Sequence, residues 1–196
     1  GADTHTFFSY RVAEAAATGG PLSANTLLAD AETEQLDEIA LACDSTEWIP
    51  LLDAGLPRNY AAVLARCEHA RDQLGLEADP AVLDALVERT RQLLGGDEAR
   101  LIDDSEDGSG RYDIYAIDVV LFCEPLADRL GTVWAAAARQ ALALAELVAQ
   151  RNGASVAWGR STGALSLCLS VELAALVHRD GLVTDTAPWL ERASIA

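Results

Sequence analysis

The chain has 196 residues, and 31 acidic against 14 basic residues give it a net charge of −17 at pH 7. This length suits a single helical domain spanning residues 1–196 with a sizeable core, and 51% hydrophobic residues argue against disorder. The negative charge would repel phosphate backbones and anionic bilayers, so nucleic acids and membrane surfaces are not expected partners. Charges interrupt every apolar run well short of about 18 residues, so no membrane span is expected.

The chain contains neither lysine nor methionine, and the absence of lysine excludes some kinds of catalytic site. All basic residues are arginine, which excludes a Schiff-base lysine and a lysine-type phosphate loop. Methionine is also absent, even at position 1, which leads us to expect a processed chain or a piece of a longer one. The cysteines form no Cys-x-x-Cys pair, which favours buried free thiols in a reducing, cytoplasmic compartment over a zinc site or disulfides; a signal peptide already removed is the alternative. They are Cys43, Cys67, Cys123 and Cys168.

Helical periodicity dominates the first half of the chain. Glycine or proline follows most of the periodic segments, as is typical of helix ends. Asp79 before Pro80 is a typical helix start, an N-cap followed by proline at the first helical position. The expected elements are helices over 4–17 and about 32–43, a short turn with Trp48 that Ser45 or Thr46 caps, a helix from Pro57 or Asn59 to Gly75, and a helix from Pro80 to Gly95.

The second half contains two irregular segments between apolar ones. Residues 97–111 hold six carboxylates and two glycines and are expected to form a loop, and residues 154–161 are also expected to be non-helical. Residues 112–130 read as a strand or a buried helix, and their length favours the helix. Further helices are expected over 132–150, capped by Thr132, over about 162–179, and after Thr184.

The expected architecture is all-α. Some helices are apolar on more than one face, notably residues 165–177, which is typical of an inner layer covered by an outer one. Successive helical hairpins in two layers predict a two-layer α/α toroid or a solenoid rather than a four-helix bundle.

Aromatic, arginine and carboxylate residues concentrate in three irregular segments, 56–60, 103–115 and 157–163, each just before an expected helix. In a barrel of hairpins such loops gather at one end. Arginine forks bind carboxylates or phosphates, aromatic faces stack on sugar or isoprenoid surfaces, and a carboxylate and a phenol can transfer protons. The residues expected around this mouth are Asn59, Tyr60, Arg111, Tyr112, Asp113, Tyr115, Trp158 and Arg160.

Structural roles compete with these assignments. Asn59 and Ser161 can act as helix caps, Trp158 can pack in the core, and Arg160 can neutralise the acidic loop. Asp103, Asp104 and Asp107 have the spacing of the aspartate-rich motif with which class I isoprenoid enzymes hold magnesium against a diphosphate. Glycines follow directly and no second magnesium motif is present, so a solvated loop is the default. Apart from magnesium in the isoprenoid alternative, no cofactor is expected.

Three short motifs resemble one family. Residues 57–66 (PRNYAAVLAR), 107–115 (DGSGRYDIY) and 158–161 (WGRS) are similar to bacterial α/α-toroid proteins of a domain-of-unknown-function family related to heparinase-type lyases and some glycoside hydrolases. The resemblance spans about residues 56–180. It implies a two-layer α/α toroid whose pocket is formed by Asn59, Arg111, Tyr112, Asp113, Tyr115, Arg160 and Ser161.

The chain departs from the family pattern in three ways. Ile114 occupies the position of a tyrosine, and Gly163-Ala164 replaces the Tyr-Arg that often follows Gly-Arg-Ser. Seven or eight helices are expected, whereas a ring of six hairpins needs about twelve. We therefore expect an incomplete ring that a missing segment or another chain completes.

The leading hypothesis is an enzyme that acts on a carbohydrate, with a small-molecule or oligosaccharide substrate that contains uronate. Arginine would bind the substrate carboxylate, Trp158 would form a stacking wall, and Tyr112, Asp113 and Tyr115 would be the acid/base candidates. An isoprenoid-processing enzyme with an apolar cavity, using magnesium at the acidic loop, is one alternative. A non-catalytic helical interaction domain is the other.

Overall fold

The computed structural model describes residues 2–95, 115–149 and 164–195. Every regular element among these residues is helical and none is a strand, which confirms the all-α prediction. The chain divides into two compact units, Gly1–Thr90 and Arg91–Ala196. No helix in the described ranges is both long and apolar enough to cross a bilayer.

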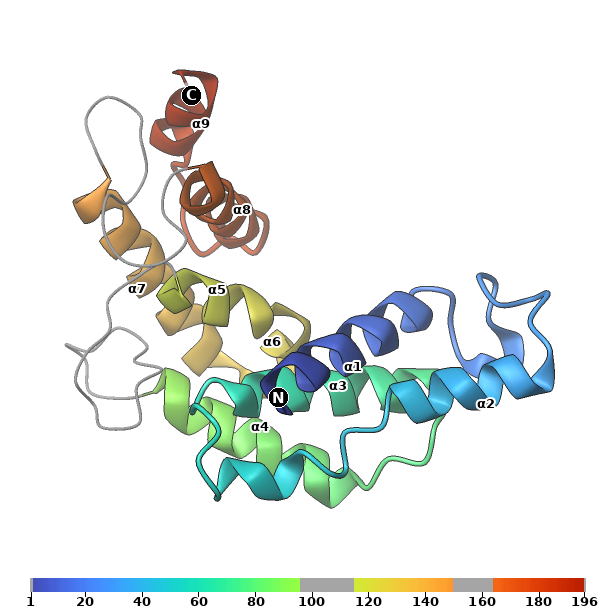
Figure 1. The fold of residues 1–196 in the computed structure, drawn as a ribbon. Coiled ribbons are helices and arrows are strands. Elements are labelled where there is room, and N and C mark those ends of the chain that lie inside the picture. The colour runs from blue at the N-terminus through green and yellow to red at the C-terminus, as the bar shows by residue number, and fades with distance from the viewer. Residues whose placement is uncertain (1, 96–114, 150–163, 196) are drawn as a thin grey trace. The chain divides into compact units, whose positions relative to one another are not determined.

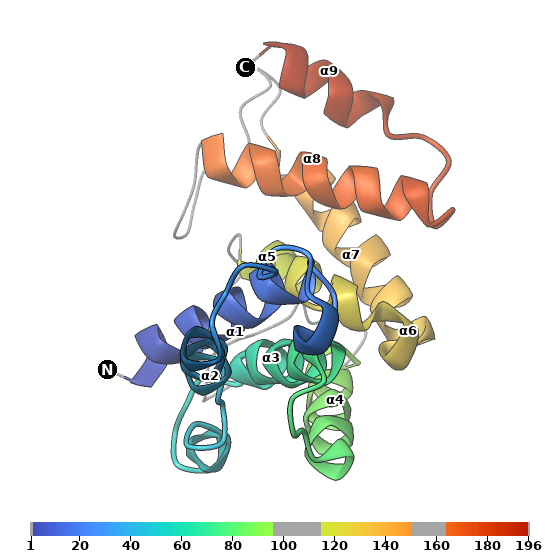
Figure 2. The ribbon, with the colours of Figure 1, turned by 90° about the vertical axis from the view of Figure 1, so that its right-hand side faces the viewer.

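The first unit is built around α3. Its elements are α1 (Ala2–Ala17), η1 (Leu22–Ala24), α2 (Thr33–Ala42), η2 (Ile49–Leu52), α3 (Tyr60–Leu74) and the larger part of α4 (Pro80–Leu94). Helix α1 lies along α3 and also contacts α2, as Figures 1 and 2 show. The small residues of the α3 sequence YAAVLA, all buried, allow this close approach, so α3 is the centre of the unit.

Aromatic and charged contacts fix α1 on α3. The Phe7 ring meets Tyr10 and Tyr60 edge to face, with centroids 5.7 Å and 5.4 Å apart. Arg66 of α3 forms an ion pair with Glu14 of α1, and its guanidinium lies 5.1 Å from the centroid of the Tyr10 ring. Such edge-to-face and cation–π pairs add about 0.5–1.5 kcal/mol each to simple burial.

Asn25 ties the end of α1 to the following loop. The side chain is 4% exposed, and its Nδ2 donates to the carbonyl oxygens of Ala16 at 2.9 Å and Gly20 at 2.6 Å. Its Oδ1 accepts from the backbone N–H groups of Leu27 at 3.0 Å and Leu28 at 3.1 Å. One amide thus forms hydrogen bonds with four backbone groups.

The second unit contains α5 (Tyr115–Phe122), η3 (Glu124–Leu126), α6 (Ala127–Leu130), α7 (Thr132–Val148), α8 (Ala164–Arg179) and α9 (Ala187–Ile195). Helix α8 packs against α5, α7 and α9. The buried indole Nε1–H of Trp134 on α7 donates to the carbonyl oxygen of Val120 on α5 at 3.0 Å. Side chains from separate helices therefore close a core within this unit.

The structure refines two predictions about helix boundaries in the second unit. The apolar segment near residues 115–130 is helical, as its length suggested, but it is broken after Phe122, where Pro125 lacks a backbone N–H for a continuous helix. Thr132 does not cap α7. Gly131 holds the N-cap position with φ 60° and ψ −135°, a conformation open to glycine, and Thr132 is the first helical residue.

Candidate functional site

The structure describes two of the predicted site residues with their side chains, Asn59 and Tyr60. Tyr115 is the first residue of α5. The others lie outside the described residues, so the convergence of the three segments stays a prediction. They are Asp103, Asp104, Asp107, Arg111, Tyr112, Asp113, Trp158, Arg160 and Ser161.

Asn59 lies at the N-cap position of α3 but does not act as a side-chain cap. The residue is 4% exposed, and its Oδ1 is buried with no hydrogen-bond partner among the described residues. The capping alternative for Asn59 is therefore wrong in this structure. Tyr60, the next residue, is 8% exposed and places its ring against Phe7.

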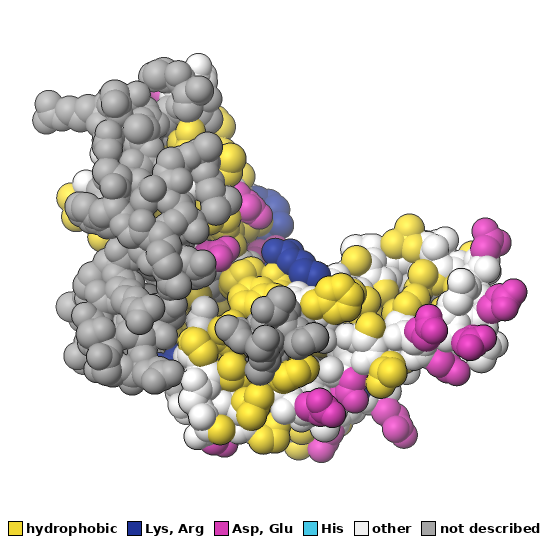
Figure 3. Space-filling model, viewed as in Figure 1, with side chains coloured by type: hydrophobic (Ala, Val, Ile, Leu, Met, Phe, Trp, Pro, Cys, Tyr) yellow, Lys and Arg dark blue, Asp and Glu magenta, His cyan; other side chains and the backbone are white. Residues whose placement is uncertain are grey.

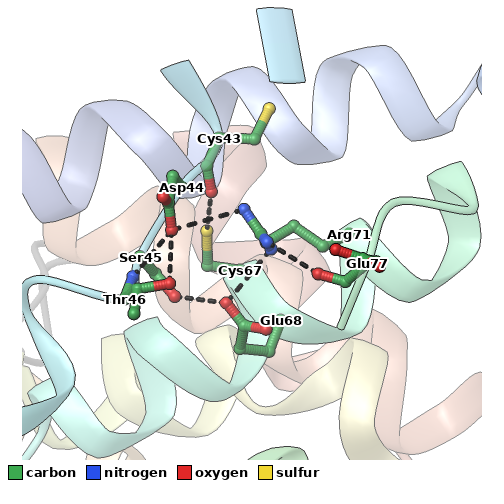
Figure 4. A network of polar contacts seen from close by, with 8 residues as sticks. All are labelled: Cys43, Asp44, Ser45, Thr46, Cys67, Glu68, Arg71 and Glu77. Atoms are coloured by element: carbon green, nitrogen blue, oxygen red, sulfur yellow. Dashed lines mark hydrogen bonds and ion pairs between the residues drawn. The ribbon is translucent and has the colours of Figure 1, made fainter. Parts of the chain in front are cut away.

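A polar network that sequence reasoning did not find joins the end of α2 to α3 (Figure 4). Its centre is Glu68, which is 4% exposed and whose Oε1 accepts a hydrogen bond from the Ser45 hydroxyl. Arg71, one turn further along α3, places Nε 3.3 Å from the same oxygen. Its Nη1 lies 3.6 Å from Oδ1 of Asp44, and its Nη2 donates to the carbonyl oxygen of Glu77 at 2.9 Å.

The segment that follows α2 is held by its own side chains. Oδ1 of Asp44 accepts from the hydroxyl of Thr46 at 2.6 Å and from its backbone N–H at 2.9 Å. These two bonds, with the nearby Arg71 guanidinium, keep the pKa of the Asp44 carboxyl below its usual value. Ser45 or Thr46 was expected to cap the turn at Trp48, but neither does, because the Ser45 hydroxyl bonds to Glu68 and the Thr46 hydroxyl to Asp44.

Two buried thiols adjoin this network. The Cys67 thiol lies 3.3 Å from the carbonyl oxygen of Cys43, and the Cys43 side chain turns away from Cys67 in Figure 4. Burial raises the pKa of the Cys43 thiol to about 11 and raises that of Cys67 further. The prediction of buried free thiols is confirmed for these two and for Cys123 but is wrong for Cys168, which is exposed.

The network forms part of the wall of a groove in the first unit. The groove has a volume of about 480 Å³ and lies between the segment after α2, α3 and the start of α4. Exposed Thr46, Glu77 and Asp79 form its rim, and Glu68 and Arg71 lie deeper. Ile49, Ala78 and Val82 complete the lining.

An apolar hollow of about 310 Å³ lies next to this groove. The two share Ile49 and Val82 in their linings, so they adjoin along η2 and α4. We refer to them as the acidic groove and the apolar hollow. The remaining residues of the hollow are Pro50, Leu52, Asp53, Ala81, Ala85, Leu86 and Arg89.

Charge is unevenly distributed over the first unit. In Figure 3 acidic side chains gather over α2 and the loop before it, where Asp30, Glu32, Glu34, Asp37 and Glu38 are all exposed. Within the described residues no group of three or more His, Cys, Asp or Glu side chains is placed to hold a metal ion. The acidic groove itself carries Arg71 against three carboxylates.

The sequence contained one signal of this site that was overlooked. Glu68 and Arg71 are three positions apart and therefore lie on the same face of a helix, where they pair. Their burial could not be anticipated, because α3 has no clear polar face in its sequence. Comparisons with protein families, with curated proteins and with solved structures found no match to this chain.

Proposed function

We propose that this chain belongs to an enzyme that acts on a carbohydrate, built from helical hairpins arranged as a two-layer α/α toroid. The all-α structure is consistent with that architecture. The motifs at residues 57–66, 107–115 and 158–161 support the proposal through their similarity to toroid lyases and hydrolases. The favoured substrate class is an oligosaccharide that contains uronate.

The observation that carries the proposal is the buried carbonyl oxygen of Asn59. A buried polar oxygen without a partner costs about 1–3 kcal/mol of folding free energy. Asn59 incurs this cost without capping α3, although another residue in its place would avoid it. An oxygen held ready to accept a hydrogen bond suits a substrate rich in hydroxyl donors, as a sugar is.

The side-chain chemistry of the other site residues suggests a role for each. Arg111 and Arg160 would bind the substrate carboxylate through paired N–H groups. Asp113, with Tyr112 and Tyr115, would supply the proton transfers that either hydrolysis or β-elimination requires. Trp158 would stack on a sugar ring, and Tyr60 and Ser161 would complete the binding surface.

Turnover of a panel of oligosaccharides tests this function. The protein is incubated with uronate-containing and neutral oligosaccharides, and new reducing ends are measured. A lyase additionally creates a carbon–carbon double bond conjugated with the uronate carboxylate, so ultraviolet absorbance of the product separates it from a hydrolase.

A matched pair of variants makes the assay specific. Asp113→Asn is expected to lower turnover at least about a hundredfold, as loss of a general acid or base does. Asp84→Asn, an exposed carboxylate on α4, is the control and is expected to leave turnover unchanged. Full turnover in Asp113→Asn, or no turnover of any member of the panel by the unaltered protein, would contradict the proposal.

A non-catalytic interaction domain is the second candidate. It is favoured by the acidic groove and the apolar hollow, which lie side by side in one unit. Binding of a partner at that surface without oligosaccharide turnover is the result that would favour it over the enzyme.

A further inference from the structure

The deeper part of the acidic groove contains the carboxylate of Glu68, and its contacts with described residues involve one of its two oxygens. Oε1 of Glu68 accepts the Ser45 hydroxyl and forms an ion pair with Nε of Arg71 at 3.3 Å, whereas none of the described residues bonds to Oε2. The side chain is 4% exposed and lines the groove. A carboxylate oxygen that faces a groove is stabilised by a donor, and a positively charged donor stabilises it most.

Arg71 does not neutralise this end of the groove. Its single charge is shared between Glu68 and Asp44, and its Nη2 is directed to the backbone of Glu77. Glu77 and Asp79 add two exposed carboxylates at the rim, and neither forms an ion pair with a described residue. The groove therefore carries a net negative charge that complements a cation.

The apolar hollow adjoins the acidic groove along η2 and α4. Ile49 and Val82 separate the two, and beyond them Ala85 and Leu86 present only hydrocarbon. Asp53 and Arg89, also in the lining of the hollow, neutralise each other through a 2.8 Å ion pair. A ligand that follows the groove thus meets negative charge first and apolar surface second.

We infer that this groove binds a basic peptide segment of a partner protein. A lysine or arginine side chain donates to Glu68 between the rim carboxylates, and an apolar side chain about one helical turn away fills the hollow. The exposed rim suits a peptide laid along the surface better than an enclosed small molecule. This binding is independent of the proposed carbohydrate activity.

Fluorescence anisotropy with a defined peptide tests the inference. The probe is a fluorescein-labelled helical peptide of alanine and glutamine that carries one lysine and, four positions later, one leucine. It is expected to bind, and substitution of its lysine by glutamate or of its leucine by glutamine is expected to weaken binding at least about tenfold. Equal affinity for the lysine and glutamate peptides would overturn the inference, as would the absence of binding.

Protein variants locate the site. Glu68→Gln retains the shape and an acceptor for Ser45 but removes the charge, and it is expected to weaken the lysine peptide at least about tenfold. Ala85→Glu, at an exposed position in the lining of the hollow, is expected to weaken the same peptide by introducing a charge opposite the leucine. If Glu68→Gln fails to fold, Ala85→Glu and the rim variants below decide the question.

Two double variants separate a local site from the general negative charge of the chain. Glu77→Gln with Asp79→Asn removes two rim charges, and asparagine can still cap α4 as Asp79 does through its 2.9 Å bond to the Ala81 N–H. Asp84→Asn with Glu88→Gln removes two charges from exposed positions of α4 outside the groove lining. The rim pair is expected to lower affinity about fivefold and the control pair to leave it within experimental error. Equal losses in both would overturn the inference.

Discussion

The hydroxyl of Ser45 donates a hydrogen bond to Oε1 of Glu68, which lies 23 positions away in the sequence. Both side chains are buried, and Arg71 completes the group from the next turn of α3. This contact holds the segment after α2 against α3 through the buried carboxylate of Glu68. Removal of one member of such a group costs more than the contact itself, because the others stay buried without compensation.

The first prediction concerns this network. Glu68→Ala leaves the Arg71 guanidinium, on a side chain 11% exposed, with only Asp44 as a charged partner, so we expect it to lower the free energy of unfolding by about 3 kcal/mol. Ser45→Ala is expected to cost about 1–2 kcal/mol. Urea unfolding followed by circular dichroism measures both.

Glu77→Ala is the control for this prediction. The contact of Glu77 with Arg71 is made by its backbone carbonyl, and its side chain is exposed, so stability should change by less than about 0.5 kcal/mol. If Glu68→Ala were no more destabilising than Glu77→Ala, the network would have no energetic role.

The second prediction concerns thiol reactivity in the folded protein. Cys168 is exposed, whereas Cys43, Cys67 and Cys123 are buried, and the pKa of Cys43 is raised to about 11. Because the thiolate is the reactive form, iodoacetamide near pH 8 should modify Cys168 first. Intact mass spectrometry should show one adduct in the native protein and further adducts only in urea. A native Cys168→Ser variant that still reacts rapidly would contradict the burial of the other three.

The third prediction is the pH dependence that follows from Cys43. Burial raises the pKa of this thiol from 9.0 to about 11 in the folded chain. Between these values the unfolded chain loses the thiol proton while the folded chain keeps it, so stability falls as pH rises from about 9 to about 11. Urea midpoints across this range should fall less steeply in Cys43→Ala. Identical slopes in the two proteins would show that Cys43 does not ionise on unfolding.

The fourth prediction tests the close approach at Gly19. A Cβ added there would lie 2.8 Å from Cγ of Asn25 and closer still to its Oδ1, which would displace an amide that bonds four backbone groups. Gly19→Ala is expected to cost about 2–3 kcal/mol, measured as a lower thermal midpoint. Gly20→Ala is the comparison, since φ of 94° strains alanine but the added carbon would lie 3.9 Å from the carbonyl oxygen of Ala24, an ordinary contact distance; it should cost about 1 kcal/mol. The reverse order would contradict this packing.

Local rules explain which parts of the structure the sequence could predict. Asp79 caps α4, and Gly75 ends α3 with φ of 72°, as expected from residues within a few positions of each helix end. Asn25 and Glu68 were not predicted, because each is a polar residue whose partners are fixed only when distant segments meet. In sequence both are typical of a solvated surface. Of the proposed catalytic pocket, the described residues include only Asn59, Tyr60 and the backbone of Tyr115.

The fifth prediction compares two asparagines that are equally buried, each 4% exposed. The Asn25 side chain bonds four backbone groups, whereas Oδ1 of Asn59 has no hydrogen-bond partner in the part of the chain that the structure describes. Asn25→Leu is therefore expected to lower the free energy of unfolding by about 3 kcal/mol or more, and Asn59→Leu to leave it unchanged or raise it by about 1 kcal/mol. If Asn59 is retained to bind a sugar hydroxyl, Asn59→Leu should also raise KM for the oligosaccharide while the protein stays folded. A loss of stability in Asn59→Leu equal to that in Asn25→Leu would assign Asn59 a structural partner and remove the support it gives to the carbohydrate proposal.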